Sequence, residues 1–151
     1  MNHVNQFLSR PLVVVVIFLA IAFYPMFISI YVFLPLLVGT MGYILILGIE
    51  KERMLYVMMA LVYFLNLEAN LSLPFFLTII ATLLIYVLFD NNLTFIRNCN
   101  LCRPVIYVVM IDIFYLGSLL AYDFIFQASS VVLDTILLYS LIVDMLVVVM
   151  L

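Results

Sequence analysis

The feature that most constrains this chain is an uncharged run over residues 11–49. Its 39 residues are roughly twice the ~20 apolar residues that a helix needs to cross the hydrocarbon layer of a membrane. The run therefore predicts two consecutive spans, over about 11–24 and 29–49. Pro25 is the expected boundary because it lacks a backbone donor and disfavours helix in the residue before it.

The composition argues against an ordinary soluble domain. Seventy per cent of the residues are hydrophobic and 9% are charged, against about 45–50% and 25% in typical globular domains. The 5 basic and 8 acidic residues are too few to cover the surface of a soluble protein of this length. We expect a single all-α domain over residues 1–151, a polytopic transmembrane bundle in contact with membrane lipids. There is no basic stripe, which argues against nucleic acid as a partner.

Polar breaks divide the rest of the chain into four more spans. Residues 50–53 are all charged, and the longest polar segment covers 90–103. The predicted spans are about 54–67, 73–89, 105–122 and 130–151, six in all. We expect the first span to be retained, because no small-x-small cleavage site follows its apolar run.

The basic residues predict the orientation of the bundle. With six spans, all of them fall on the side that also holds both termini: Arg10, Lys51, Arg53, Arg97 and Arg103. Positive residues are retained in the cytoplasm, so we expect both termini to be cytoplasmic. A missed or false span before the 90–103 loop would scatter these residues across both sides, so the pattern also favours the span count.

Small residues allow membrane helices to approach closely. Candidates are three residues of the second span and two of the fifth: Gly39, Gly42, Gly48, Gly117 and Ala121. Packing within the bundle is the favoured interpretation, and docking of a partner protein's helix is the alternative.

Two aspartates fall deep inside the last two spans. At 1.5 Å per residue, Asp112 lies about 12 Å from the cytoplasmic end of its helix and Asp144 about 10 Å from the chain terminus. The two carboxyls therefore have similar depth on adjacent antiparallel helices. An aspartate at that depth costs on the order of 3 kcal/mol. Three interpretations follow: a neutral acid bonded to hydroxyls, a contact with a partner's basic residue, and a proton or cation site. The available tyrosine hydroxyls are those of Tyr107, Tyr115 and Tyr139.

Residue patterns for catalysis are missing from the sequence. It contains no serine–histidine–acid set, no glycine-rich phosphate loop and no metal-ligand cluster. Cys99-x-x-Cys102 has the spacing of half a zinc site or of a redox pair. The sole histidine, His3, leaves the zinc site incomplete and the α/β fold of a redox motif is absent, so an incidental pair is the favoured interpretation. We therefore expect a protein that is not an enzyme, with no catalytic residue, metal site or cofactor.

The middle of the chain resembles the MreD family of small bacterial inner-membrane proteins. Pro35-Leu36-Leu37 matches a proline-led second span, and Asn66-Leu67-Glu68 matches a third span that ends in an acidic residue. Asn70-Leu71-Ser72-Leu73-Pro74 then opens the fourth span. The resemblance covers about residues 35–90. It departs from the family where Glu68 replaces the usual aspartate and Phe75-Phe76 the usual leucine–glycine.

This resemblance implies a non-enzymatic scaffold of the bacterial inner membrane. Its role would be in cell shape and peptidoglycan elongation, through protein–protein interaction with a single-span MreC-like protein and wall-synthesis enzymes. The Glu68–Pro74 turn would be periplasmic and could face such a partner. The candidate partner or ligand contacts are Glu68, Asn70, Pro74, Asp112, Asp134 and Asp144.

The competing hypothesis is a small-molecule-binding subunit of a transporter, similar to the substrate-binding component of energy-coupling-factor vitamin transporters. Those proteins are also six-span bundles without catalytic residues. Asp134, Asp123 and Glu68, with several tyrosines, could line such a pocket. The short outer loops argue against it, because they give little cover for a ligand.

Overall fold

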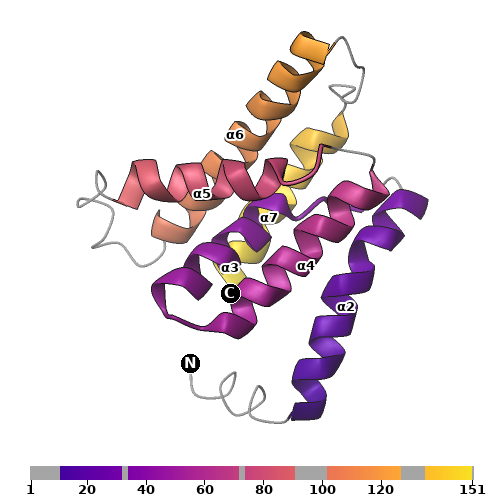
Figure 1. The fold of residues 1–151 in the computed structure, drawn as a ribbon, viewed down its shortest axis with the longest axis vertical. Helices are drawn as coiled ribbons and strands as arrows, with labels where there is room; N and C mark the ends of the chain where they lie inside the picture. Colours follow the sequence, from indigo (N-terminus) through magenta and orange to yellow (C-terminus); the bar gives the residue numbers. More distant parts are fainter. Residues whose placement is uncertain (1–10, 32–33, 72–73, 91–101, 127–134, 151) are drawn as a thin grey trace.

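The structure, a computed structural model, describes residues 11–31, 34–71, 74–90, 102–126 and 135–150. These residues form six helices and no strand, which confirms the expected all-α fold (Figure 1). The helices are α2 (Pro11–Ile30), α3 (Val38–Glu50), α4 (Met54–Asn70), α5 (Leu77–Asp90), α6 (Cys102–Phe126) and α7 (Thr135–Met150).

The helices differ in their capacity to span a membrane. Only α2 and α6, among the helices described, are long and apolar enough to cross one unaided. The other four contain 13 to 17 residues, which corresponds to roughly 20–26 Å at 1.5 Å per residue. The hydrocarbon core of a bilayer is about 30 Å thick.

The prediction that Pro25 separates two spans is wrong. Helix α2 continues through Pro25 to Ile30, and the next helix begins only at Val38. A proline inside a helix removes a donor and disturbs the carbonyls one turn before it. Here the side-chain amide of Asn66, on α4, donates a hydrogen bond to the Ala22 carbonyl. The carbonyl that loses its amide donor to Pro25 is that of Ile21, four residues earlier, and this bond ties α2 to α4 one residue further along the same turn.

Two predicted helix ends also differ from the structure. Helix α4 ends at Asn70 rather than near residue 67, and α6 runs on to Phe126 rather than ending near 122. Both extensions continue an apolar helix into residues that were assigned to a turn because of their polar neighbours, Glu68 and Asp123.

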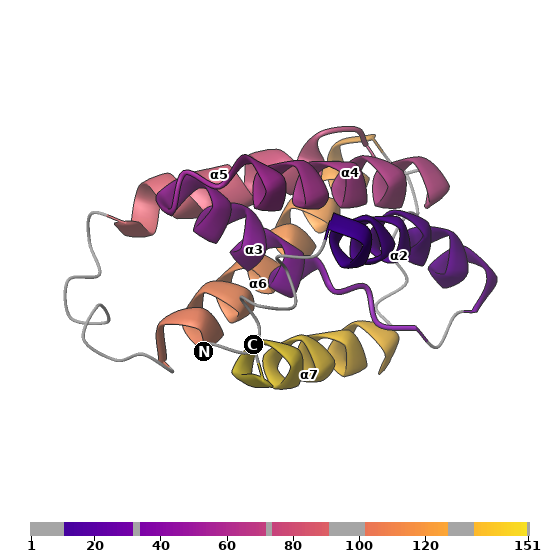
Figure 2. The same cartoon turned by 90° about the horizontal axis from the view of Figure 1, so that it is seen from below.

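Helix α3 occupies the centre of the molecule. It packs against α4, α5, α6 and α7, while α2 packs on α4 (Figures 1 and 2). The largest fully buried apolar side chains come from α3, α4, α5 and α6, and include Leu45, Phe64, Tyr63, Ile85 and Ile111. The core therefore lies around α3, and α2 lies at the edge of the bundle.

The short helices α3 and α5 begin in the same way. A proline, Pro35 or Pro74, is followed two residues later by a left-handed residue, Leu37 (φ 50°) or Phe76 (φ 67°), and the helix starts at the next position. A side chain larger than glycine in this conformation costs about 1–2 kcal/mol. It persists only where the surrounding structure holds it in place.

Three of the four glycines lie at close helix contacts. A Cβ added to Gly42 would lie 2.7 Å from Cγ2 of Thr82 and 3.0 Å from Ile111, and one added to Gly48 would lie 2.8 Å from Val57. Gly39 is similarly enclosed, as described below. By contrast, a Cβ on Gly117 would have nothing within 4 Å, and Ala121 on the next turn is exposed. The small residues of α3 thus pack inside the bundle, whereas those of α6 face outward.

This contrast predicts opposite effects for the same substitution. We expect Gly42→Ala to destabilise the protein by about 1–3 kcal/mol, because the new methyl group overlaps a buried threonine. Gly117→Ala, its matched control, should be neutral or stabilising by up to about 1 kcal/mol, because alanine favours helix and meets no neighbour. Thermal unfolding in detergent, followed by circular dichroism, measures both. Equal effects would contradict the packing described here.

Candidate functional site

Polar side chains from three helices converge on the non-helical backbone just before α3. The Tyr24 hydroxyl donates to the Pro35 carbonyl (3.0 Å), and the Tyr63 hydroxyl donates to the Leu36 carbonyl. The Leu36 amide donates to Oγ of Ser140 (2.9 Å). Because backbone groups inside a protein must find partners, these three bonds from α2, α4 and α7 allow an irregular segment to lie within the bundle.

Asp144 completes this arrangement by capping α3. Its side chain, on α7, is fully buried. One carboxylate oxygen accepts a bond from the Thr40 hydroxyl (3.0 Å), and the other accepts one from the Gly39 amide (3.3 Å). The first amides of a helix have no partner within the helix, and Leu37, the residue at the cap position, makes no side-chain cap bond. Asp144 is therefore the N-cap of α3, although it lies on a helix that is distant in sequence. An acidic side chain is favourable there because the N-terminus of a helix is the positive end of its dipole.

Asp112 of α6 lies against the same glycine. A Cβ on Gly39 would lie 2.7 and 2.8 Å from the two carboxyl oxygens of Asp112, and the Asp112 and Asp144 side chains interact with each other. The two aspartates predicted at similar depth are thus brought together at the start of α3. Gly39 makes this possible because any side chain there would occupy the space that the carboxyl group takes.

A small cavity adjoins the two aspartates. Its volume is about 30 Å³, and its lining comes from the segment before α3 and from α3, α6 and α7: Leu36, Val38, Asp112, Tyr115, Leu116, Ser140 and Leu141. Oδ2 of Asp112 is buried and has no hydrogen-bond partner among the described residues. The cavity has room for one or two water molecules. It is far below the ~300 Å³ at which small-molecule pockets begin.

Glu68 forms a second cap of the same kind. Its side chain, on α4, is fully buried. One oxygen accepts the Phe76 amide (2.7 Å), and the other accepts the Thr78 amide (2.9 Å) and the Thr78 hydroxyl. These are the donors at the start of α5. The sequence suggests that Glu68 could face a partner protein. Its side chain is instead fully buried, because the beginning of α5 encloses it.

The remaining candidates lie in different places. Asn70 is half-buried and donates to the carbonyl (2.7 Å) and to the side-chain oxygen (2.6 Å) of Asn66. Pro74 is half-buried just before α5. Asp134 lies outside the described residues, as does Cys99. No group of three or more potential metal-ligating side chains occurs within the ranges that the structure describes.

Sequence reasoning missed several residues of this site. The hydroxyl that binds Asp144 is that of Thr40, rather than any of the three tyrosines considered, and Tyr24, Tyr63 and Ser140 were not singled out. The available signal was the presence of isolated hydroxyl residues within otherwise apolar spans, since a polar group there needs a bonding partner.

The chain matches no protein-family model, and neither a curated protein nor a solved structure is significantly similar to it. The resemblance to MreD over residues 35–90 therefore stays a prediction from the sequence.

The capping role of Glu68 predicts a large loss of stability when its oxygens are removed. Glu68→Leu would leave two amides and one hydroxyl at the start of α5 without an acceptor, and we expect a loss of about 2–4 kcal/mol. Glu68→Gln is the matched control, because it keeps one acceptor oxygen and should lose about half as much. Unfolding in detergent gives both values. A Leu variant as stable as the Gln variant would rule out the cap.

The two aspartates should differ in their contributions. Asp144→Ala removes two hydrogen bonds to the first turn of α3, and we expect it to cost about 1–3 kcal/mol. Asp112→Ala should cost less, because Oδ2 of Asp112 makes no bond. Comparing the unfolding midpoints of the two variants tests this order, and the reverse order would show that Asp112 is the principal cap.

Proposed function

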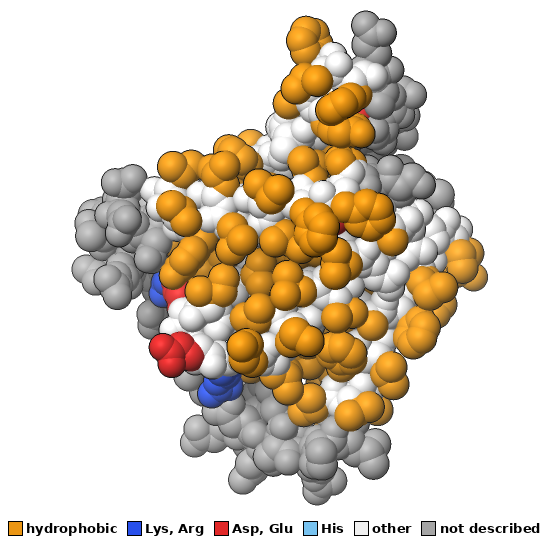
Figure 3. All heavy atoms as spheres, viewed as in Figure 1, with side chains coloured by type: hydrophobic (Ala, Val, Ile, Leu, Met, Phe, Trp, Pro, Cys, Tyr) orange, Lys and Arg blue, Asp and Glu red, His pale blue; other side chains and the backbone are white. Residues whose placement is uncertain are grey.

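We propose that this chain is a multi-pass protein of the bacterial inner membrane, with six helices in the bilayer and both termini in the cytoplasm. The apolar surface supports this location. Large hydrophobic side chains are exposed over every helix described except the central α3, with Phe124 87% and Met150 89% exposed, and they dominate the face seen in Figure 3. Soluble monomers rarely expose apolar patches of this extent, whereas hydrocarbon tails accommodate them.

The described basic residues support the orientation. Arg103, at the start of α6, forms an ion pair with Glu50, at the end of α3. Lys51 and Arg53 lie within three residues of Glu50, so all three cations lie at the end of the bundle where α3 ends. In Figure 3 the Lys and Arg side chains of the visible face are gathered at its lower left. That end is the cytoplasmic one if positive residues are retained there.

The short helices are compatible with six spans because non-helical backbone extends their reach. The described residues just before α3, 34–37, are not helical, and extended backbone advances about 3.3 Å per residue, more than twice the rise of a helix. Non-helical backbone at membrane depth is tolerated where protein encloses it. The side-chain bonds before α3 provide this enclosure.

In that membrane we propose that the protein is a non-enzymatic scaffold, similar to MreD, that binds a single-span MreC-like partner and wall-synthesis enzymes. One observation carries this proposal: the deep acids Asp144 and Glu68 bind the starts of the chain's own helices, and the surface left for others is apolar. Such a surface suits partner helices. On α6, exposed Gly117 and Ala121 would let another helix approach closely.

A pull-down tests the proposal. The tagged chain is purified from its native membrane in mild detergent, and co-purifying proteins and small molecules are identified by mass spectrometry. We expect a single-span protein with a periplasmic domain, together with wall-synthesis enzymes. Gly117→Leu should reduce recovery at least about fivefold, or ~1 kcal/mol, because the new side chain separates the helices.

The control is Ile142→Phe, a bulky change at an exposed position of α7, which should leave recovery unchanged. A vitamin-like ligand, or a coupling subunit with ATPases, would overturn the scaffold proposal in favour of a transporter subunit.

A further inference from the structure

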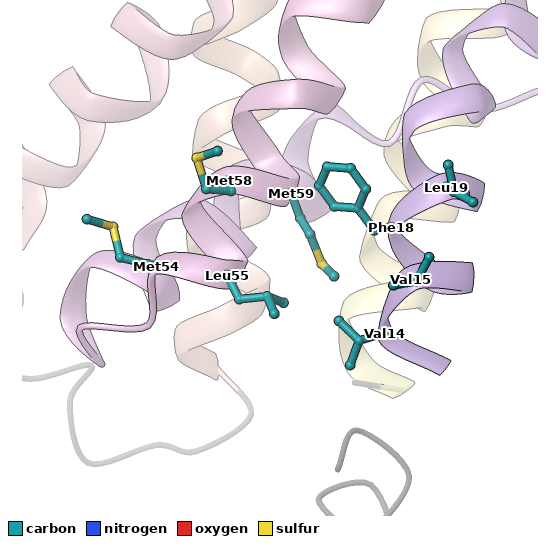
Figure 4. Close-up of a pocket in the computed structure, with 8 residues that line it drawn as sticks. All are labelled: Val14, Val15, Phe18, Leu19, Met54, Leu55, Met58 and Met59. Atoms are coloured by element: carbon teal, nitrogen blue, oxygen red, sulfur yellow. The ribbon is translucent and has the colours of Figure 1, made fainter. Parts of the chain in front are cut away.

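A groove lies between the first halves of α2 and α4, and its lining is entirely apolar. Its volume is about 400 Å³. Four residues from each helix line it: Val14, Val15, Phe18 and Leu19 from α2, and Met54, Leu55, Met58 and Met59 from α4. Figure 4 shows these side chains on the two helices, with Phe18 and Met59 extending into the space between them.

The two helices that form the groove are joined at one end and apart at the other. Towards their C-terminal ends, α2 and α4 are joined by the bond from Asn66 to Ala22 and by the stacked rings of Tyr24 and Tyr63, whose centroids are 6.3 Å apart. The groove lies at the opposite end, where both helices begin (Figure 1). In the proposed topology this end faces the cytoplasmic leaflet.

The size of the groove favours a hydrocarbon chain over a helix. A helix 10–12 Å in diameter with a 5.4 Å pitch occupies on the order of 400–600 Å³ per turn, so the groove would hold about one turn. A hydrocarbon chain is much thinner and can lie along the groove for most of its length. The three methionines suit such an occupant, because their flexible thioether side chains adapt to a ligand without fixed shape.

The charge at the mouth of the groove favours an anionic headgroup. Residues 50–53 connect α3 to α4 directly beside Met54. Glu50 is neutralised by Arg103, which leaves Lys51 and Arg53 against Glu52, a net charge of +1. The Arg53 guanidinium lies 5.7 Å from the centroid of the Tyr56 ring and donates to its hydroxyl (3.4 Å). A cation is thus held at the start of α4, where the headgroup of a lipid in the groove would lie.

We infer that this groove binds one acyl chain of an anionic phospholipid of the cytoplasmic leaflet, with its headgroup at Lys51 and Arg53. The inference rests on the membrane location proposed above and is independent of the MreC-like partner.

Lipid titration of the purified full-length chain, followed by native mass spectrometry, tests the inference. The probes are phosphatidylglycerol and phosphatidylcholine with identical acyl chains. We expect the first phosphatidylglycerol to bind at least fivefold more tightly than phosphatidylcholine. The double variant Lys51→Gln/Arg53→Gln should lose this preference, and the groove-filling double variant Val15→Phe/Met58→Phe should lose the tight site for both lipids.

Val87→Phe on α5 is the matched control, because it adds the same ring at an exposed apolar position away from the groove; its lipid binding should equal that of the parent. The groove-filling positions are themselves exposed, so folding should be retained, and circular dichroism verifies this.

Equal affinity of the parent for the two lipids would overturn the inference, as would unchanged binding in the groove-filling variant. A dimer of the parent that the groove-filling variant converts to a monomer would assign the groove to a second copy of the chain instead.

Insertion into phosphatidylglycerol vesicles is measured in parallel. Failure to insert would overturn the membrane location itself, whereas insertion without lipid preference would overturn only the lipid site.

Discussion

The fold depends on finding acceptors for backbone amides at helix starts that lie inside the protein. The first amides of α3 and α5 have no partners within their own helices, and neither start is capped by the residue that precedes it in the chain. Buried carboxylates from other helices fill this need, Asp144 for α3 and Glu68 for α5. A buried donor without an acceptor costs about 1–3 kcal/mol, so these contacts determine where α7 and α4 can lie.

The position of α3 follows from this constraint. Its start is enclosed by α2, α4, α6 and α7, each of which contributes a polar side chain that touches the segment 35–40. Gly39 lets two carboxyl groups approach the same turn, and Gly42 and Gly48 bring neighbouring helices close further along. Helix α2 takes little part in the core, so its first half is free to stand away from α4 and leave the groove between them.

The sequence predicted the parts of the fold that depend on local hydrophobicity. Apolar runs and charged breaks gave six helices and the approximate bounds of most of them. Rise per residue placed Asp112 and Asp144 at similar depth. The path through Pro25 was not predictable in this way, because α2 is packed along α4, and the bond between Asn66 and Ala22 joins residues 44 positions apart. The hydrogen bonds of Glu68, Thr40 and Ser140 are likewise contacts between helices. They cannot be predicted from the composition of one helix or from the residue spacing within it.

The two caps differ in when they can form during synthesis. Glu68 precedes Thr78 by 10 residues, so the start of α5 meets its cap as soon as both leave the ribosome. Asp144 follows Gly39 by 105 residues, which takes roughly 5–20 s to synthesise at ~5–20 residues per second. Throughout that interval the start of α3 lacks the cap on which the centre of the bundle depends. Helix α7 therefore completes the polar contacts at the start of α3 only after the helices between them have been made.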